Sequence, residues 1–275
     1  MNTVTAFADE ISPDLETQLQ VLTSEGIKHL ELRGVWGKNV LKLTDDELYR
    51  VKAELERRGF RVSAVGSPIG KIGVADDFAQ HMVDFARALF VAKVFDTPYI
   101  RIFSFFIPEG DDPSQYRDEV LRRMKALVRQ AEIEGIVLLH ENEKHIYGDT
   151  PERCLDLLEA CASRHLRCAF DPANFVQCGV RPYTEAYPLL AEHIEYMHIK
   201  DALFADGKVT PAGDGDGDVA KVLQALKRRG YEGFLSLEPH LSGAGMFSGF
   251  SGPDLFKVAS DALKRLLQNM DETWN

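Results

Sequence analysis

Eight short apolar runs alternate with helix-like segments along this 275-residue chain. The runs cover residues 3–8, 29–33, 61–66, 99–107, 136–141, 166–171, 195–199 and 233–238. Runs of this length are typical of β-strands. The segments between them repeat apolar residues at helical spacing, as at Leu15, Leu19 and Leu22. Strict alternation predicts a parallel sheet, and eight such units predict a closed (β/α)8 TIM barrel that residues 1–275 form as a single domain.

Residues with strong capping preferences stand at the joints between these predicted elements. Ser12 and Thr150 each precede a proline, which predicts an N-cap followed by proline at the first helical position. Thr44 and Glu47 have the spacing of a capping box. Helix ends are predicted at Gly26, Gly59, Gly135 and Gly230. No nucleotide-binding glycine fingerprint follows the first strand, which argues against an open, doubly wound sheet.

The balance of charge limits the classes of partner. The chain has 43 acidic and 32 basic residues and a formal net charge of -11. Nucleic-acid binding requires a surplus of Lys and Arg, so we expect no nucleic acid partner. No window reaches the roughly 18 apolar residues of a membrane-spanning helix, and the N-terminus lacks a secretory pattern. We therefore expect a cytoplasmic protein with no membrane partner, and a homo-oligomer is compatible with these features.

Chemistry-bearing side chains follow four successive predicted strands. The segments IVLLHENE, CAFDPANF, YMHIKD and FLSLEPH place Glu141, Asp171, His198 and Glu238 where strands five to eight end. In a TIM barrel these ends meet at one mouth. Three carboxylates and one imidazole form a ligand set suited to Mn²⁺, Mg²⁺, Co²⁺ or Zn²⁺.

The alternative interpretation is that each acid only caps the helix that follows it. Four such residues in register at one mouth favour the metal site over four independent caps. Carboxylates a few ångströms apart also raise one another's pKa, so a dication is expected to compensate their charge. The sequence therefore predicts one bound divalent metal ion.

With these motifs the chain resembles the sugar phosphate isomerase/epimerase family with the xylose isomerase-like TIM barrel. Relatives in that family include ketose 3-epimerases, inosose dehydratase and endonuclease IV. The resemblance extends from FADEIS through ELRGVWGKN and VGSPIGKI to FSGPDLF. It implies that Glu141, Asp171, His198 and Glu238 are metal ligands, with Mn²⁺ the first ion to expect. It also implies that Glu141 and Glu238 are the catalytic acid/base pair.

The chain departs from some of these relatives. Ketohexose 3-epimerases carry an arginine shortly after the metal-binding histidine, whereas residues 198–203 of this chain read HIKDAL. This difference argues against a ketohexose substrate. Endonuclease IV uses many histidines for three metals, and this chain has eight in total. Together with the acidic charge, this argues against DNA repair.

A further set of polar residues lies at or near the same predicted mouth. The candidates for substrate binding are Asn174, Lys200, His240, Arg33 and Ser67. For Arg33 and Ser67, as for Glu31 and Arg101, an ion pair or packing role inside the barrel explains the position equally well. Strand alternation places Glu143 on the same face as Glu141 and His140 on the other, so His140 is expected to pack rather than bind metal.

Two glycine-rich segments complete the candidates. In GDGDGD, residues 213–218, exposed amides ahead of the next helix resemble a phosphate cradle. Its three aspartates would repel a phosphate, which favours an unphosphorylated polyol or keto-sugar, although the glycine- and serine-rich segment described next leaves a phosphorylated substrate open. Residues 241–253 contain Met246 and Phe250 among glycines, and we expect this segment to act as a lid over bound substrate.

These observations predict a metal-dependent sugar or polyol isomerase or epimerase. It would remove a proton next to a carbonyl and proceed through an enediolate. Loss of a β-hydroxyl from a keto-polyol such as an inosose would instead make the enzyme a dehydratase. Phosphodiester hydrolysis and a catalytically silent sugar-binding barrel are the two remaining alternatives, and both receive less support.

Overall fold

The computed structural model describes residues 2–242 and 251–275, and its main sheet confirms the predicted strands. Its eight strands are β1 (Thr3–Ala6), β2 (His29–Leu32), β5 (Arg61–Gly66), β6 (Tyr99–Ile102), β7 (Val137–Glu141), β8 (Leu166–Phe170), β9 (Ile194–Ile199) and β12 (Phe234–Leu237). Each of them overlaps one of the eight apolar runs.

The strands form a nearly closed parallel barrel. Their hydrogen-bonded order is β1-β12-β9-β8-β7-β6-β5-β2, and every recorded pair in it is parallel. β1 and β2, the two ends of this order, also lie beside each other. The predicted TIM barrel is therefore confirmed. Two small antiparallel hairpins decorate it, formed by β3 (Gly34–Val35) with β4 (Lys38–Asn39) and by β10 (Asp201–Ala202) with β11 (Val209–Thr210).

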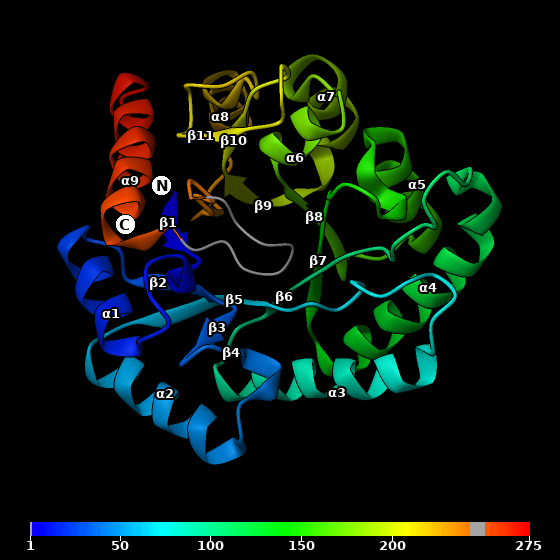
Figure 1. Ribbon diagram of the computed structural model, residues 1–275, viewed down its shortest axis with the longest axis horizontal. Helices are drawn as coiled ribbons and strands as arrows, with labels where there is room; N and C mark the ends of the chain where they lie inside the picture. Colours follow the sequence, from blue (N-terminus) through cyan, green and yellow to red (C-terminus); the bar gives the residue numbers. More distant parts are fainter. Residues whose placement is uncertain (1, 243–250) are drawn as a thin grey trace.

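Helices surround the barrel strands (Figure 1). They are α1 (Leu15–Ser24), α2 (Asp45–Arg57), α3 (Phe78–Val94), α4 (Arg117–Glu134), α5 (Pro151–Cys161), α6 (Pro172–Gln177), α7 (Tyr187–Leu190), α8 (Val219–Arg228) and α9 (Gly252–Asn269). Short 3-10 or π turns occur at Ala8–Glu10, Val40–Lys42, Pro113–Tyr116, Tyr147–Asp149, Pro182–Ala186 and Ala191–His193. Among the described residues, none of the helices has both the length and the apolar character needed to cross a bilayer.

The helix boundaries follow the predicted capping residues with one exception. Thr44 and Glu47 form the capping box of α2, and Thr150 caps α5. The four predicted glycines all have positive φ at or next to helix ends. The N-cap prediction for Ser12 was wrong, because Asp14 is extended and its carboxylate accepts the Thr17 amide hydrogen bond at 2.9 Å.

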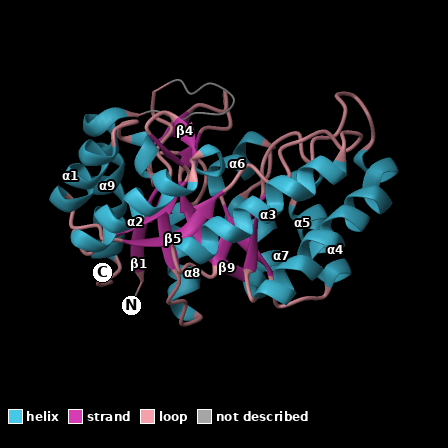
Figure 2. Cartoon of the chain, turned by 90° about the horizontal axis from the view of Figure 1, so that it is seen from below, coloured by secondary structure: helices cyan, strands magenta, loops and turns pink. Residues whose placement is uncertain are grey.

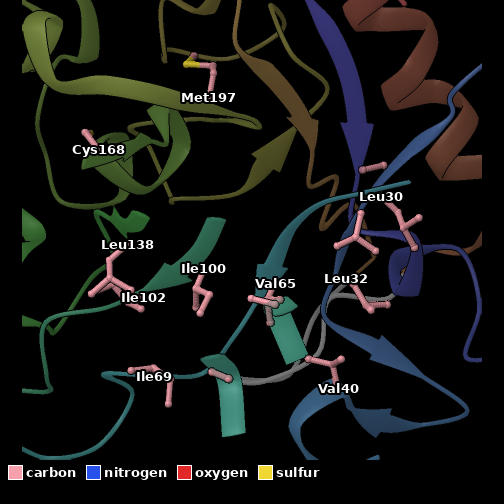
Figure 3. Close-up of a cluster of buried hydrophobic side chains, with 14 of the residues drawn as sticks. Leu30, Leu32, Val40, Val65, Ile69, Ile100, Ile102, Leu138, Cys168 and Met197 are labelled. Atoms are coloured by element: carbon pink, nitrogen blue, oxygen red, sulfur yellow. The ribbon is translucent and has the colours of Figure 1, made fainter. Parts of the chain in front are cut away.

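Strand alternation divides the core into an outer and an inner layer. Outward-facing residues such as Leu138, Cys168 and Met197 pack in the large cluster shown in part in Figure 3. Inward-facing Leu139 and Tyr196 belong to a smaller cluster inside the barrel. Because side chains alternate along a strand, the next inward positions come two residues later, at the carboxyl ends of the strands. Figure 2 shows both chain termini at one end of the barrel and β4 at the other.

Gly70, in the connection after β5, has a conformation that no other residue fits. Its φ is +88°, and a Cβ there would lie 2.1 Å from the Phe103 carbonyl oxygen. We expect Gly70→Ala to lower the free energy of unfolding by about 3 kcal/mol, from the left-handed backbone and the overpacking together. Urea unfolding measures this change.

Gly59→Ala is the matched control, because Gly59 has φ +71° and a Cβ added there would meet nothing within 4 Å. Gly59→Ala should lower the free energy of unfolding by only roughly 1–2 kcal/mol, the cost of the left-handed backbone alone. Equal losses in the two variants would mean that the Phe103 carbonyl does not restrict Gly70.

Candidate metal centre

The four predicted metal ligands meet at the carboxyl ends of four neighbouring strands. Glu141 ends β7, Asp171 follows β8, His198 lies in β9 and Glu238 follows β12. All four are buried, and one ligand atom from each lies within 4.8 Å of all the others. The cluster predicted from the strand ends therefore exists in space.

The donor atoms of this cluster fit a divalent ion. Mn²⁺ or Mg²⁺ accepts carboxylate oxygens and an imidazole nitrogen at about 2.1 Å, so opposite ligands stand about 4.2 Å apart. The observed 4.8 Å limit is close to that span. Among the described residues, Glu141 Oε2, Asp171 Oδ2 and both ring nitrogens of His198 are buried without a hydrogen-bond partner. The two carboxylate oxygens each lie within ion-pair distance of a side-chain cation, Arg101 Nη1 at 3.4 Å and Lys200 Nζ at 2.9 Å. Buried polar atoms normally have partners, so His198 Nδ1, which lies within 3.9 Å of a carboxylate oxygen from each of the other three residues, supports a cation here.

The chain also supplies cations of its own to the cluster. Lys200 Nζ lies 2.9 Å from both Asp171 Oδ2 and Glu238 Oε2. Arg33 Nη1 lies 3.1 Å from Glu238 Oε1. The expectation that these carboxylates depend on a dication for compensation was therefore too strong, because side-chain cations share that role. The unsatisfied His198 Nδ1 supports a metal better than the charge argument does.

The carboxylates differ in their readiness to ionise. Burial raises the pKa of Glu141, but His198 and Arg101 together outweigh it and bring the pKa to about 2. Burial also opposes ionisation of Glu238, yet Lys200 and other cations bring its pKa well below the ordinary value. Burial dominates at Asp171 and raises its pKa to about 6. Both glutamates are therefore ionised at neutral pH.

Asp171 is placed for both of the roles that the sequence left open, helix cap and metal ligand. Its Oδ1 accepts the Asn174 amide hydrogen bond at 2.9 Å as the N-cap of α6. Its Oδ2 points instead to the cluster, 3.9 Å from His198 Nδ1. Capping and ligation thus use different oxygens and do not exclude each other.

The five candidate substrate-binding residues occupy two kinds of position. Asn174 and Lys200 contact the cluster directly, with Asn174 Nδ2 donating to Glu141 Oε1 at 3.0 Å. The others, Arg33, Ser67 and His240, line a cavity of about 380 Å³ together with Glu141, Glu143 and Glu238. The Ser67 hydroxyl donates to the Arg101 carbonyl at 2.6 Å, so its proton is already used. Substrate contact by these residues remains a prediction.

Sequence reasoning did not single out two acids near the cluster, Asp9 and Glu10, and it considered a third, Glu31, only for an ion pair inside the barrel. Asp9 and Glu10 bind Arg33 at 2.7 and 2.6 Å, and both lie in the FADEIS motif after β1. Glu31 is fully buried, with Oε2 3.2 Å from His198 Nε2. A signal for Glu31 was present, because an acid between two leucines in a short strand must point into the barrel.

His140 and the GDGDGD segment have structural partners. His140 Nε2 lies 3.0 Å from Ser104 Oγ, which confirms that His140 packs outside the cluster. The amides of Gly213, Gly215 and Gly217 donate to the buried Asp201 carboxylate at 2.9, 3.1 and 2.8 Å. These amides are therefore occupied within the protein and do not form the phosphate cradle considered above.

Most of the predicted lid, residues 243–250 of 241–253, lies outside the described residues. The described ends of that segment are joined near the cluster. The Leu241 amide donates to Ser251 Oγ at 3.1 Å, and the Ser251 amide donates to the Glu10 carbonyl at 2.8 Å.

Comparison with known proteins gives a family match over most of the chain. The model of the xylose isomerase-like TIM barrel family matches residues 19–266. An uncharacterised protein of Methanocaldococcus jannaschii is 26% identical over 149 residues, which are 52% of this chain and 51% of that protein. The chain thus spans about half the length of the curated relative that it matches.

Solved structures resemble this fold over nearly its whole length. A D-tagatose 3-epimerase-like protein superposes with a TM-score of 0.79 at 19% identity and covers 98% of each chain. The probable 3-DHS dehydratase of Bacillus anthracis, involved in petrobactin synthesis, gives 0.75 at 19% identity and covers 96% of this chain and 99% of that one. A xylose isomerase-like TIM barrel protein from Mycobacterium smegmatis, in complex with magnesium, gives 0.69 at 17% identity and covers 97% of each. At these identities the likeness concerns the fold.

Proposed function

This chain belongs to the xylose isomerase-like TIM barrel family, and we propose that it is a metal-dependent sugar or polyol isomerase or epimerase. The observation that carries the proposal is the pair of Glu141 and Glu238. Both are buried, both have lowered pKa values, and both line the same cavity. Strands β8 and β9 separate β7 from β12 in the barrel, so the two carboxylates reach the cavity from different sides.

In the proposed mechanism one glutamate takes a proton from the carbon next to a carbonyl, and the other returns one. Asn174 donates to Glu141 Oε1, and Arg33 donates to Glu238 Oε1, so each carboxylate has one oxygen fixed. Return of the proton to the opposite face of the same carbon gives an epimer. Return to the neighbouring carbon gives an aldose or ketose isomer.

The metal would be held by Glu141, Asp171, His198 and Glu238. A divalent ion there, Mn²⁺ first and Mg²⁺, Co²⁺ or Zn²⁺ as alternatives, would polarise the substrate carbonyl and stabilise the enediolate. The similar Mycobacterium smegmatis barrel was solved in complex with magnesium, which supports a divalent ion in a protein of this fold. The cavity of about 380 Å³ lies within the size range of small-molecule sites and accepts a monosaccharide or cyclic polyol.

A dehydratase is the second candidate, favoured by the likeness to the probable 3-DHS dehydratase. Elimination of a β-hydroxyl needs an acid that protonates the leaving oxygen. His240 lines the cavity, with Nε2 3.4 Å from Glu238 Oε1, and is placed for that role. The two reactions share the first proton abstraction; an isomerase or epimerase then returns a proton to carbon, whereas a dehydratase releases the protonated β-hydroxyl as water.

A single assay tests the common step and separates the two candidates. The protein, loaded with Mn²⁺, is incubated with a panel of ketoses and inososes in heavy water. We expect deuterium at the carbon beside the carbonyl, with either an epimer or isomer or a dehydrated product by mass and NMR. Binding without any exchange or product across the panel would favour a silent sugar-binding barrel and contradict the proposal.

A further inference from the structure

Glu31 lies inside the barrel directly behind the candidate metal cluster. It comes from β2, is 0% exposed, and approaches His198, in β9, from the side opposite the other ligands. His198 Nδ1 is 3.2 Å from Glu141 Oε1 and 3.8 Å from Glu238 Oε2. Its other ring nitrogen, Nε2, is 3.2 Å from Glu31 Oε2. The imidazole therefore stands between the cluster and Glu31.

The other polar neighbours of the Glu31 carboxylate are Ser236 and Arg101. Ser236 Oγ donates to Glu31 Oε2 at 2.7 Å, and Ser236 pairs with His198 in the parallel ladder of β12 and β9. Arg101 Nε is 4.0 Å from Glu31 Oε1, at the outer limit of an ion pair. The hydrogen bond from Ser236 is therefore the shortest polar contact of Glu31, and the His198 imidazole lies nearer to it than the Arg101 guanidinium does.

We propose that Glu31 is a positioning residue that fixes the orientation of His198 as a metal ligand. A neutral imidazole has one N–H donor and one lone pair. Glu31 Oε2 is an acceptor 3.2 Å from Nε2, and a proton kept on Nε2 by this contact leaves the Nδ1 lone pair directed at the cluster, the arrangement in which an outer carboxylate sets the tautomer of a ligating histidine. Phe7, whose ring centroid lies 5.3 Å from that of His198 in an edge-on arrangement, restricts the imidazole from one side.

The inference rests on the metal site proposed above, and metal affinity tests it without reference to turnover. Glu31→Met removes the acceptor at similar volume, and Glu31→Gln keeps an oxygen that can accept from Nε2. We expect Glu31→Met to weaken Mn²⁺ and Co²⁺ binding 10- to 100-fold, as is typical on loss of an outer partner, and Glu31→Gln to weaken it less. Competition with a chromophoric chelator gives the affinity, and the visible spectrum of the Co²⁺ form reports the ligand geometry.

Ser63→Ala is the matched control for a buried polar change inside the barrel. Ser63 is 1% exposed and its hydroxyl lies 2.7 Å from Thr5 Oγ1 and 2.8 Å from the Tyr196 hydroxyl, away from the ligands. Its Co²⁺ spectrum and affinity should match those of the parent. An equal loss in Ser63→Ala, or parent-like affinity in both Glu31 variants, overturns the inference. If Glu31→Met does not fold, Glu31→Gln decides, and an unchanged affinity and spectrum there overturn it.

The parent protein separates this inference from the proposed function. If the parent binds neither Mn²⁺ nor Co²⁺, the metal site and the role of Glu31 both fail. If the parent binds metal and the Glu31 variants bind it equally well, only the role of Glu31 fails.

Discussion

Glu238→Gln is expected to slow hydrogen exchange between substrate and solvent by at least about 100-fold, the typical contribution of a general base. Glutamine keeps the size of the side chain and an oxygen that can still accept from Arg33 Nη1, which lies 3.1 Å from Glu238 Oε1. It cannot accept a carbon-bound proton at neutral pH. The loss should therefore appear in kcat, because the shape of the cavity is retained. Deuterium incorporation in heavy water measures it.

Glu143→Gln provides the matched control for this change. Glu143 lines the same cavity but lies outside the four-residue cluster, and its Oε2 is 3.2 Å from Lys71 Nζ. The same substitution there should leave exchange within a few-fold of the parent. Metal content must be assayed in parallel, since Glu238 is also a ligand candidate. A metal-loaded Glu238→Gln protein that exchanges at the parental rate would reduce Glu238 to a ligand or bystander.

The barrel and its four-residue cluster were predictable because both follow from local periodicity. Leu139 and Glu141 are two residues apart, as are Tyr196 and His198, and such pairs point inward on one strand. Each strand end could be recognised in the sequence by itself, and the barrel rule then brings the ends to one mouth. The cluster of Glu141, Asp171, His198 and Glu238 confirms that reasoning in space.

The surroundings of the cluster were not predictable in the same way. Arg33 and Glu238 are 205 positions apart, as are Glu31 and Ser236. No local pattern pairs residues at such separations, because the contact depends on which inward side chain reaches across the barrel. The same limit explains why the sequence overstated the need for a dication. Nothing in the segment HIKD indicates that Lys200 contacts Asp171 and Glu238.

The miss at the first helix has a different, local origin. Ser12-Pro13 and Thr150-Pro151 have the same pattern, yet only Thr150 is an N-cap. In the first case another good cap, Asp14, stands two residues further on, and its carboxylate accepts both the amide and the hydroxyl of Thr17. Ser12 and Asp14 are therefore two possible N-caps within one turn, and the charged residue, Asp14, is the one that caps the helix.

Asp171→Asn is expected to weaken divalent metal binding by more than about 100-fold. Loss of a residue that only hydrogen-bonds to a ligand typically weakens binding by about 10- to 100-fold, and loss of a charged ligand should cost more. Asparagine retains an oxygen for the 2.9 Å N-cap hydrogen bond from the Asn174 amide but removes the negative charge at the cluster. Burial raises the pKa of Asp171 to about 6, so ionised Asp171 costs stability at neutral pH, above that pKa. The neutral amide relieves this cost, and the variant should be at least as stable as the parent in the presence of a chelator.

Thermal unfolding with and without Mn²⁺ separates the two effects, because a ligand that binds only the native state raises its midpoint by mass action. We expect the parent to be stabilised by the ion and Asp171→Asn to show little change. Asp77→Asn is the matched control, since Asp77 is the N-cap of α3 and accepts from the Ala79 amide at 2.8 Å. Asparagine caps a helix about as well as aspartate, so this control should keep the full metal-induced shift. A parental shift in Asp171→Asn would show that Asp171 serves only as the cap of α6, and the four-ligand site would then lose one of its members.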